Sequence, residues 1–381
     1  MEENRVDSCP DKKMDCNNGG LSAANENQQL ATASTDFVEA SRNNYILPRS
    51  GGWPQRLHVG AMLVLSAIAF YFAAAEVIAG QVRGWEVWIF ATMYVFANLG
   101  ITVGFHRFLT HRAFKAGSFI KALLIILGSM SGQGPAIYWV GLHRRHHRFS
   151  DQALDPHSPL WMDDRPARNK IEGFFHSQIG WAFTHRMTNT IVFCKDLYRD
   201  HLVVWLSQRY FFWLFLGLLI PTIVGAVIEQ SAWGAWKGLL WGGGLRLFFS
   251  YHFINSVNSI SHLFGYRSFA TRENSRNNAW LALPTFGETW HNNHHAYPRS
   301  AFFGLRWWEI DIGGLVVRLL EMLGLVSSVV RADQTVLDDL SIREFENFDR
   351  REEADFKMKS QHAGRDARSP DAASSDRVAD S

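Results

Sequence analysis

Histidines recur in this sequence at spacings that suit metal binding. Two segments, HRRHH and HNNHH, have the pattern His-x-x-His-His; a third, HRFLTH, has two histidines five residues apart, and a single histidine ends NSISH. Neutral imidazole binds iron, zinc, copper or nickel, so we expect transition-metal chemistry. The candidate ligands are His106, His111, His143, His146, His147, His262, His291, His294 and His295.

The spacing within these clusters indicates two metal ions. In each His-x-x-His-His segment, residues i, i+3 and i+4 lie on one face of a helix, close enough to converge on metal. His106 and His111 are about 140° apart on an ideal helix, so they need a bend in the chain or a metal pair between them. The nine candidate histidines would give each of two metals about four or five nitrogens and leave a coordination position open.

Other metal-site patterns fit the sequence less well. A carboxylate-bridged di-iron bundle needs paired Glu-x-x-His motifs and two further glutamates. The sequence has one such motif, Glu288-Thr-Trp-His291, and it lacks the zinc-protease pattern His-Glu-x-x-His. We therefore expect Glu288 to orient a histidine rather than to bind metal.

Four apolar stretches must position these histidines. Residues 57–80, 85–105, 210–229 and 235–253 are each long enough to cross a bilayer as a helix, and short connections pair them into two hairpins. The apolar stretch 119–130 is too short to span and predicts an interfacial or re-entrant helix. The sequence therefore predicts an all-α integral membrane fold, in which four transmembrane helices carry a helical cap that holds the metal site.

The charge distribution orients these predicted helices. Lys and Arg are frequent between the two hairpins, whereas the opposite loops carry little beyond Arg83 and Lys237. The positive-inside rule therefore predicts a multi-pass protein with the middle segment, the histidines and both termini in the cytoplasm. Residues 1–45 and 331–381 are polar and predict disordered tails around a membrane domain of residues 46–330.

Composition argues against several other classes of protein. A net charge of +2 without a basic-aromatic motif does not suggest a nucleic-acid partner, and three cysteines are too few for a four-cysteine iron–sulfur cluster. No repeat relates the two halves, as it would in many transporters. A zinc protein without redox chemistry stays an alternative, which metal identity and O₂ dependence would test. Arg246 is a costly charge inside the last predicted span, and no role is assigned to it.

The segments HRFLTH, HRRHHRFSD, NSISHLFG and GETWHNNHH resemble the histidine boxes of membrane fatty acyl desaturases. The resemblance runs from about Trp85 to Leu325, and the segments around His143 and His291 resemble in particular the Δ9-type enzymes of bacteria and cyanobacteria. It implies a di-iron site bound by the nine histidines, with Asn258 holding a metal-bound water and no catalytic residue beyond the metal centre. If the chain is bacterial, it implies the inner membrane.

The implied activity is O₂-dependent desaturation of a long-chain acyl group, carried by coenzyme A or by a membrane lipid, with a cis double bond at Δ9. Acid–base side chains do not supply an oxidant strong enough for an unactivated methylene, whereas iron with O₂ does. Electrons would come from a separate donor, such as a ferredoxin or cytochrome b5 with its reductase, because the tails carry no haem motif. The alternative is a membrane di-iron hydroxylase or ketolase, which inserts oxygen; the NSISH element favours desaturation.

Two sets of residues are candidate substrate contacts. Phe90, Tyr94 and Ala97 lie about two to four helical turns deeper than His106 and could form the floor of an acyl tunnel between the second and fourth spans, with lipid-facing packing as the alternative. Arg144 and Arg145 flank the histidines and could meet an anionic head group such as the coenzyme A phosphates, with acidic lipid as the alternative partner.

Overall fold

Helices dominate the part of the chain that the computed structural model describes, residues 44–47, 52–162, 165–184 and 186–333. The predicted tails, 1–45 and 331–381, lie almost wholly outside these residues. All elements described below belong to one unit that begins at Tyr45.

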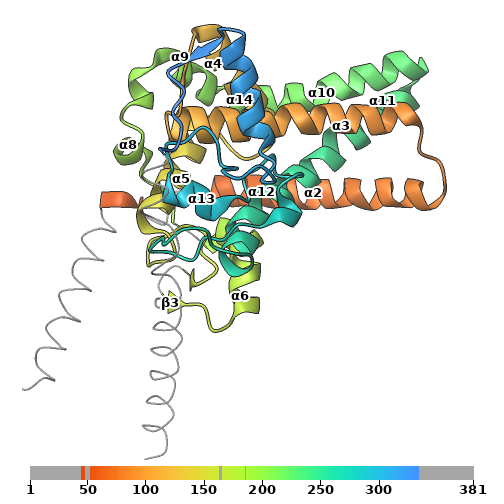
Figure 1. Cartoon of the computed structure of the whole chain (residues 1–381). Helices are drawn as coiled ribbons and strands as arrows, with labels where there is room; N and C mark the ends of the chain where they lie inside the picture. Colours follow the sequence, from red (N-terminus) through yellow and green to blue (C-terminus); the bar gives the residue numbers. More distant parts are fainter. Residues whose placement is uncertain (1–43, 48–51, 163–164, 185, 334–381) are drawn as a thin grey trace, which may run out of the picture. The chain divides into compact units, whose positions relative to one another are not determined.

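The long helical segments and the shorter elements follow one another along the chain (Figure 1). The long segments are α2 (Trp53–Ile78), α3 (Gly84–Leu99) with the π-helix η2 (Gly100–Thr110), α10 (Tyr210–Glu229), and α11 (Ala232–Gly238) with the π-helix η5 (Leu239–Leu245) and α12 (Arg246–Leu263). The other helices are α4 (Ser118–Met130), α5 (Ala136–Phe149), α6 (Lys170–Phe175), η3 (His176–Gly180), α7 (Trp181–Thr184), α8 (Thr190–Phe193), η4 (Leu197–Arg199), α9 (His201–Gln208), η6 (Ala279–Leu281), α13 (His291–Ala296) and α14 (Ile312–Met322). Strand β1 (Lys115–Ala116) pairs antiparallel with β4 (Val326–Ser327), and β2 (Trp161–Met162) with β3 (Arg165–Pro166).

Three of the described helices are long and apolar enough to cross a membrane: α2, the continuous α3–η2 helix and α10. They coincide with three of the four predicted spans. The fourth predicted span, 235–253, falls on α11, η5 and α12, where the helix changes from α to π at Leu239 and back at Arg246. It is not among the three, so the four-span topology stays a prediction. The short apolar stretch predicted at 119–130 is the helix α4, which is too short to span.

The glycine run of η5 determines how the long helices pack. A Cβ at Gly244 would lie 2.4 Å from the Cβ of Ala69 on α2, and one at Gly242 would lie 2.4 Å from the Cβ of Pro221 on α10. Because small residues let helices approach this closely, α2, α3 and α10 all pack on η5. The helices α2 and α3 therefore meet η5 rather than each other, whereas α10 and α11 pack directly as a hairpin.

Ion pairs join the helices at the end away from the histidines. Lys237 Nζ lies 2.8 Å from Glu76 Oε2 and 3.1 Å from Glu86 Oε1, joining α11 to α2 and α3. Arg83 pairs with Glu229 at the end of α10. Arg83 and Lys237, the two basic residues predicted in the loops on the side opposite the histidines, therefore both pair with carboxylates.

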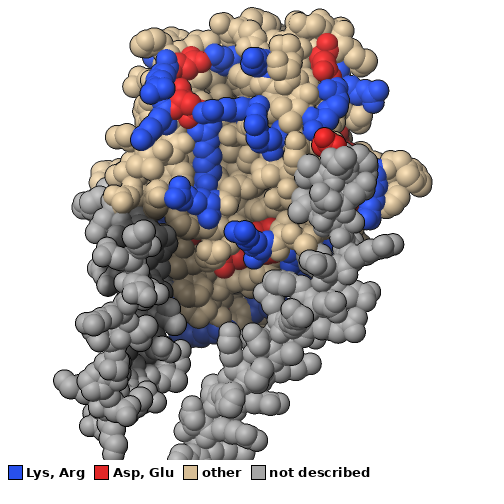
Figure 2. Space-filling model, turned by 60° about the vertical axis from the view of Figure 1, so that its left-hand side comes forward, with Lys and Arg blue, Asp and Glu red and all other residues tan. Residues whose placement is uncertain are grey.

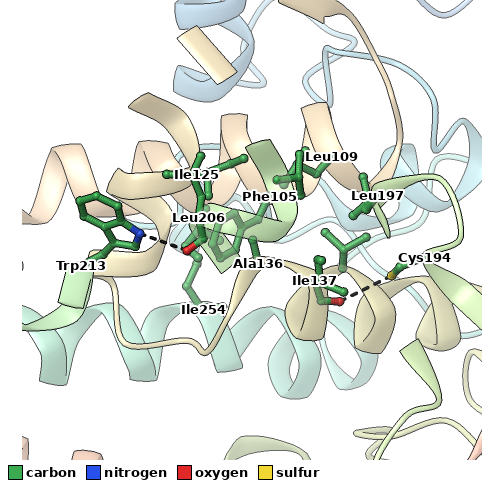
Figure 3. Packing of buried hydrophobic residues seen from close by; sticks show 13 residues of the cluster. Phe105, Leu109, Ile125, Ala136, Ile137, Cys194, Leu197, Leu206, Trp213 and Ile254 are labelled. Carbon is green, nitrogen blue, oxygen red and sulfur yellow. Dashed lines mark hydrogen bonds between the residues drawn. The ribbon is translucent and has the colours of Figure 1, made fainter. Parts of the chain in front are cut away.

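Residues of the histidine-bearing helices η2 and α5 contribute to an apolar core (Figure 3). Phe105 and Leu109 of η2 meet Ala136 and Ile137 of α5, and all four are at least 94% buried. Close van der Waals packing of Phe105 stabilises this contact. This packing fixes η2 against α5, and so fixes their histidines relative to one another.

Candidate metal centre

The nine predicted ligand histidines gather into two groups. In each group, one ring nitrogen per residue lies within 4.8 Å of those of all the others. The first group is His106, His111, His143, His147 and His294; the second is His146, His262, His291 and His295. Each group therefore brings together residues far apart in the sequence, up to 188 positions for His106 and His294, in a five-plus-four arrangement that suits two metals.

Each His-x-x-His-His segment contributes to both groups. On α5, His143 and His147 face the first group, while His146 faces the second. On α13 the division is reversed, because His291 and His295 face the second group and His294 the first. In both segments, the histidines at i and i+4 belong to one group and the histidine at i+3 belongs to the other. Each of the two helices therefore contributes histidines to both groups rather than to one.

The π-helix η2 explains the five-residue spacing of HRFLTH. A π-helix has i→i+5 hydrogen bonds, and here His111 N donates to His106 O over 3.2 Å. This bond stacks residues five apart on one face, and the two imidazole centroids lie 4.9 Å from each other. The expected bend is therefore a change of helix type, of a kind frequent at functional sites.

Ring nitrogens face each other where a cation would fit. His294 Nε2 lies 3.1 Å from His106 Nε2 and 2.9 Å from His147 Nε2, and His291 Nε2 lies 3.0 Å from His262 Nε2. His106 and His262 direct Nδ1 at carboxylates, which only accept, so Nδ1 is the protonated nitrogen and Nε2 is the atom left to bind metal. Imidazole nitrogens that converge at this spacing, five in one group and four in the other, are a donor set that suits two metal ions.

Four buried carboxylates fix the outer edges of the rings. Asp155 lies 3.0 Å from His146 Nδ1, Asp151 lies 2.9 Å from His262 Nδ1, and Glu273 lies 3.5 Å from His295 Nδ1. Glu288 contacts His106 Nδ1 and also accepts from Arg107 over 2.8 Å. Such partners set the tautomer and orientation of ligand histidines. Glu288 thus has the place expected for an orienting residue.

The roles of Asp151, Asp155 and Glu273 are not predicted from the sequence. Asp151 and Asp155 follow the HRRHH helix in the turn SDQALDP, where Asp151 and Leu154 have positive φ values of 58° and 83°. That turn folds Asp155 back onto His146, nine residues earlier. Two aspartates directly after a histidine box were the available signal.

Burial and electrostatics keep most of these rings neutral. Burial lowers the pKa of five histidines well below its usual range, and the neighbouring imidazoles lower it further: His111, His143, His147, His291 and His294. Neutral imidazole is the form that binds metal. Burial also opposes charge on His262, but the Asp151 carboxylate outweighs it and raises the pKa of His262 to about 9. A metal there must therefore displace a proton.

The remaining predicted site residues lie around these groups. Asn258 is half-buried on α12, one turn before His262. Phe90 and Tyr94 pack on Phe249 and Phe253 of α12, and Tyr94 Oη donates to Pro284 O over 2.5 Å. Ala97, one turn further along α3, is buried. These contacts put Phe90 and Tyr94 on the α12 side of α3.

The two predicted head-group arginines are held inside the protein. Arg145 is 2% exposed, and its guanidinium donates to the carbonyls of Leu154 and Arg186. Arg144 pairs with Asp196 over 2.7 Å and keeps 16% of its side chain exposed. Of the two, only Arg144 retains a surface that a ligand could reach.

Comparisons with known proteins agree on one family. The family model described as fatty acid desaturase matches residues 83–312. A hex-5-enoyl-[acyl-carrier protein] acetylenase of Moorena producens (strain JHB) is 44% identical over 245 residues, 64% of this chain and 76% of the relative. An sn-1 stearoyl-lipid 9-desaturase of Anabaena variabilis is 37% identical over 282 residues, 73% of this chain and 92% of the relative.

A plant protein shows the same similarity: Delta-9 acyl-lipid desaturase 2 of Arabidopsis thaliana is 35% identical over 243 residues, 64% of this chain and 74% of the relative. The matched region contains every residue of the two histidine groups. The chain belongs to the fatty acid desaturase family and is an enzyme that desaturates fatty acyl chains.

Proposed function

We propose that this enzyme uses O₂ to introduce a cis Δ9 double bond into a long-chain acyl group carried by a membrane lipid. The observation that carries the proposal is the pair of buried histidine groups, five and four residues strong, inside the matched family region. The lipid carrier is supported by relatives named as stearoyl-lipid 9-desaturases. An acyl-carrier protein is the second candidate carrier, favoured by the 44% identical acetylenase.

In this proposal the nine histidines hold two iron ions, and Asn258 holds a water beside the second group. Two irons bound there would supply, with O₂ and electrons, an oxidant able to take hydrogen from a methylene. The chain's own part is to orient the rings through Asp151, Asp155, Glu273 and Glu288, and to keep bulk water from them by burial. The metal-binding end would face the cytoplasm, at the inner membrane if the chain is bacterial.

An apolar cavity offers a place for the acyl chain beside the metal centre. It has a volume of about 260 Å³, and the residues that line it carry no Asp, Glu, Lys or Arg. Trp181 in its wall packs on His157, with ring centroids 5.5 Å apart, and His157 packs on His146 at 4.5 Å. An uncharged wall suits a hydrocarbon chain on a neutral carrier better than the phosphates of coenzyme A.

The tunnel floor expected at Phe90, Tyr94 and Ala97 is not part of this cavity. In this proposal, Phe90, Tyr94 and Ala97 line the far end of the acyl path, since Phe90 and Tyr94 pack on aromatic rings of α12. The burial of Arg145 argues against its contact with a head group, and the pairing of Arg144 with Asp196 weakens that role.

Filling the apolar cavity is expected to impair catalysis without removing metal. Val59 lines the cavity, so Val59→Trp should lower kcat/KM about ten-fold or more, because the indole would occupy space that the acyl chain needs and a loss of about 1.4 kcal/mol in transition-state binding is ten-fold. Leu57→Trp, at a 64% exposed position of α2, is the matched control and should stay near wild type. Steady-state kinetics and metal content measure both; equal activity of the two variants would exclude the cavity from the acyl path.

Removing one orienting carboxylate is expected to weaken metal binding. Asp155→Asn keeps the shape but loses the charge that fixes His146, so metal affinity should fall about 10- to 100-fold. Competition with a chelator measures this affinity directly. Glu172→Gln, which changes a carboxylate in an exposed pair with Arg165, is the control. Unchanged affinity in Asp155→Asn would contradict an orienting role.

The proposed reaction is tested in a desaturase-deficient host that expresses this chain. A new monoene, absent with His294→Ala, is the expected result, and mass spectrometry locates its double bond. Analysis of intact lipids and of acyl-carrier-protein esters distinguishes the two candidate carriers. Hydroxylated chains in place of a monoene would instead support the hydroxylase, which the family match does not favour.

A further inference from the structure

A second, polar opening reaches the histidine groups from outside the protein. Its volume is about 440 Å³, and its walls include His111 and His147 of the first group and His295 of the second. The opening therefore exposes one edge of both metal positions at once. Arg144, Arg272 and Glu273 also line it, so its wall is charged, in contrast to that of the apolar cavity.

Basic side chains surround this polar opening. Arg272 lines it and is exposed, and the exposed Arg299 follows Pro298, which also lines it. Arg112 and Arg144 share the single carboxylate of Asp196, and the exposed Lys195 precedes that aspartate. We call Arg112, Arg144, Lys195, Arg272 and Arg299 the basic rim.

The acidic residues near the basic rim are already engaged. Asp196 pairs with two arginines, and Glu273 faces His295. For Arg272 and Arg299, no ion pair with another described residue is found. The rim therefore presents a net positive charge. On the face drawn in Figure 2, Lys and Arg cover more of the surface than Asp and Glu.

The reaction needs electrons that this chain does not store. Each double bond consumes one O₂ and forms two waters, taking two hydrogens from the substrate, two protons from solvent and two electrons from a donor. The chain has three cysteines, too few for the four thiolates that hold an ordinary iron–sulfur cluster. Electrons from a separate carrier protein would enter where the metal positions approach the surface.

We propose that the basic rim is the docking surface for an acidic one-electron carrier protein, seated over the polar opening. The inference rests on the proposed function, and it adds the sign of the donor's charge and the place where it binds. Complementary charge steers the donor to the opening and orients it there. Two docking events per double bond deliver the two electrons, and each oxidises one donor molecule.

The test measures binding of an oxidised, acidic plant-type [2Fe–2S] ferredoxin to the full-length, metal-loaded enzyme in nanodiscs of zwitterionic phosphatidylcholine. Affinity should fall as salt rises, because screening weakens exposed charge pairs. The double variant Arg272→Glu with Arg299→Glu should bind at least about ten-fold more weakly and with a shallower salt dependence. Arg318→Glu, at an exposed arginine of α14 that lines a different hollow, should bind like wild type.

Kinetics separate docking from chemistry. With ferredoxin, the double variant should show a KM for the donor raised about ten-fold at unchanged kcat; with dithionite as reductant, it should form as much monoene as wild type. Salt-independent binding, or an equal loss in Arg318→Glu, would overturn the docking surface. So would a loss seen only in anionic nanodiscs, which would assign the rim to lipid. Absence of monoene from wild type with either reductant would refute the proposed function instead.

Discussion

Replacing His294 by alanine is expected to abolish desaturation and to remove metal from one position only. His294 Nε2 faces both His106 Nε2 and His147 Nε2, so it is central to the first group. Activity should fall at least about 100-fold, because even the outer partners of ligand histidines are typically worth 10- to 100-fold. Iron per chain should fall from about two to about one, since the second group keeps its own ligands. Monoene yield and elemental analysis measure the two effects.

Two further variants make this expectation specific. His262→Ala removes a ligand of the second group and should give the complementary partial loss of iron with the same loss of activity. His201→Ala changes an exposed histidine at the start of α9 and should match wild type in both. Full activity in His294→Ala, or zinc in place of iron in the wild type, would contradict the assigned metal chemistry.

The sequence was enough to choose nine histidines that the structure brings into two groups, whereas their role as metal ligands stays a prediction. Their division between the groups could not be predicted. Helical spacing places His143, His146 and His147 on one side of α5. Which of the two groups each ring joins depends on how α5 and α13 face each other, and the spacing does not determine that. The π-helix at HRFLTH was likewise hidden, because hydropathy does not distinguish α from π hydrogen bonding.

The membrane segments were predictable where length and hydropathy decide, as in α2, α3 with η2, and α10. The stretch 235–253 is harder to identify as a membrane span, because glycines lower its hydropathy and Arg246 places a charge within it. Pattern alone also favoured pairing α2 with α3, whereas the small residues of η5 let a third helix lie between them. Packing of small residues is a property of the assembled helices and leaves little trace in hydropathy.

Arg246, which had no role at the level of sequence, satisfies backbone carbonyls that lack helical partners. It is fully buried, and its guanidinium donates to Gly217 O over 2.9 Å, to Gly242 O over 3.2 Å and to Met130 O. Gly217 O has no α-helical donor because the residue four positions on is Pro221, which has no N–H. Met130 is the last residue of α4, where carbonyls are also left without partners. Arg246 thus ties together α4, α10 and η5.

Removing this arginine is therefore expected to destabilise the fold. Arg246→Met leaves the carbonyls buried without donors and should cost about 2–4 kcal/mol of unfolding free energy, since each unsatisfied group costs about 1–3 kcal/mol and loss of the buried charge offsets part of this. The unfolding free energy of Arg246→Lys should lie between those of Arg246→Met and wild type. An ammonium group lacks the planar guanidinium geometry that reaches several separate acceptors. Equilibrium unfolding in detergent measures the free energy of each variant.

Pro221→Ala tests the proposed cause. The alanine would supply an N–H that can bond Gly217 O, so Arg246→Met should cost about 1 kcal/mol less in the Pro221→Ala background than in wild type. Thr222→Ala, one residue further along α10, is the control and should leave the cost of Arg246→Met unchanged. A coupling energy of zero between positions 221 and 246 would show that the Gly217 bond does not stabilise the fold. Arg246 would then act through α4 and η5 alone.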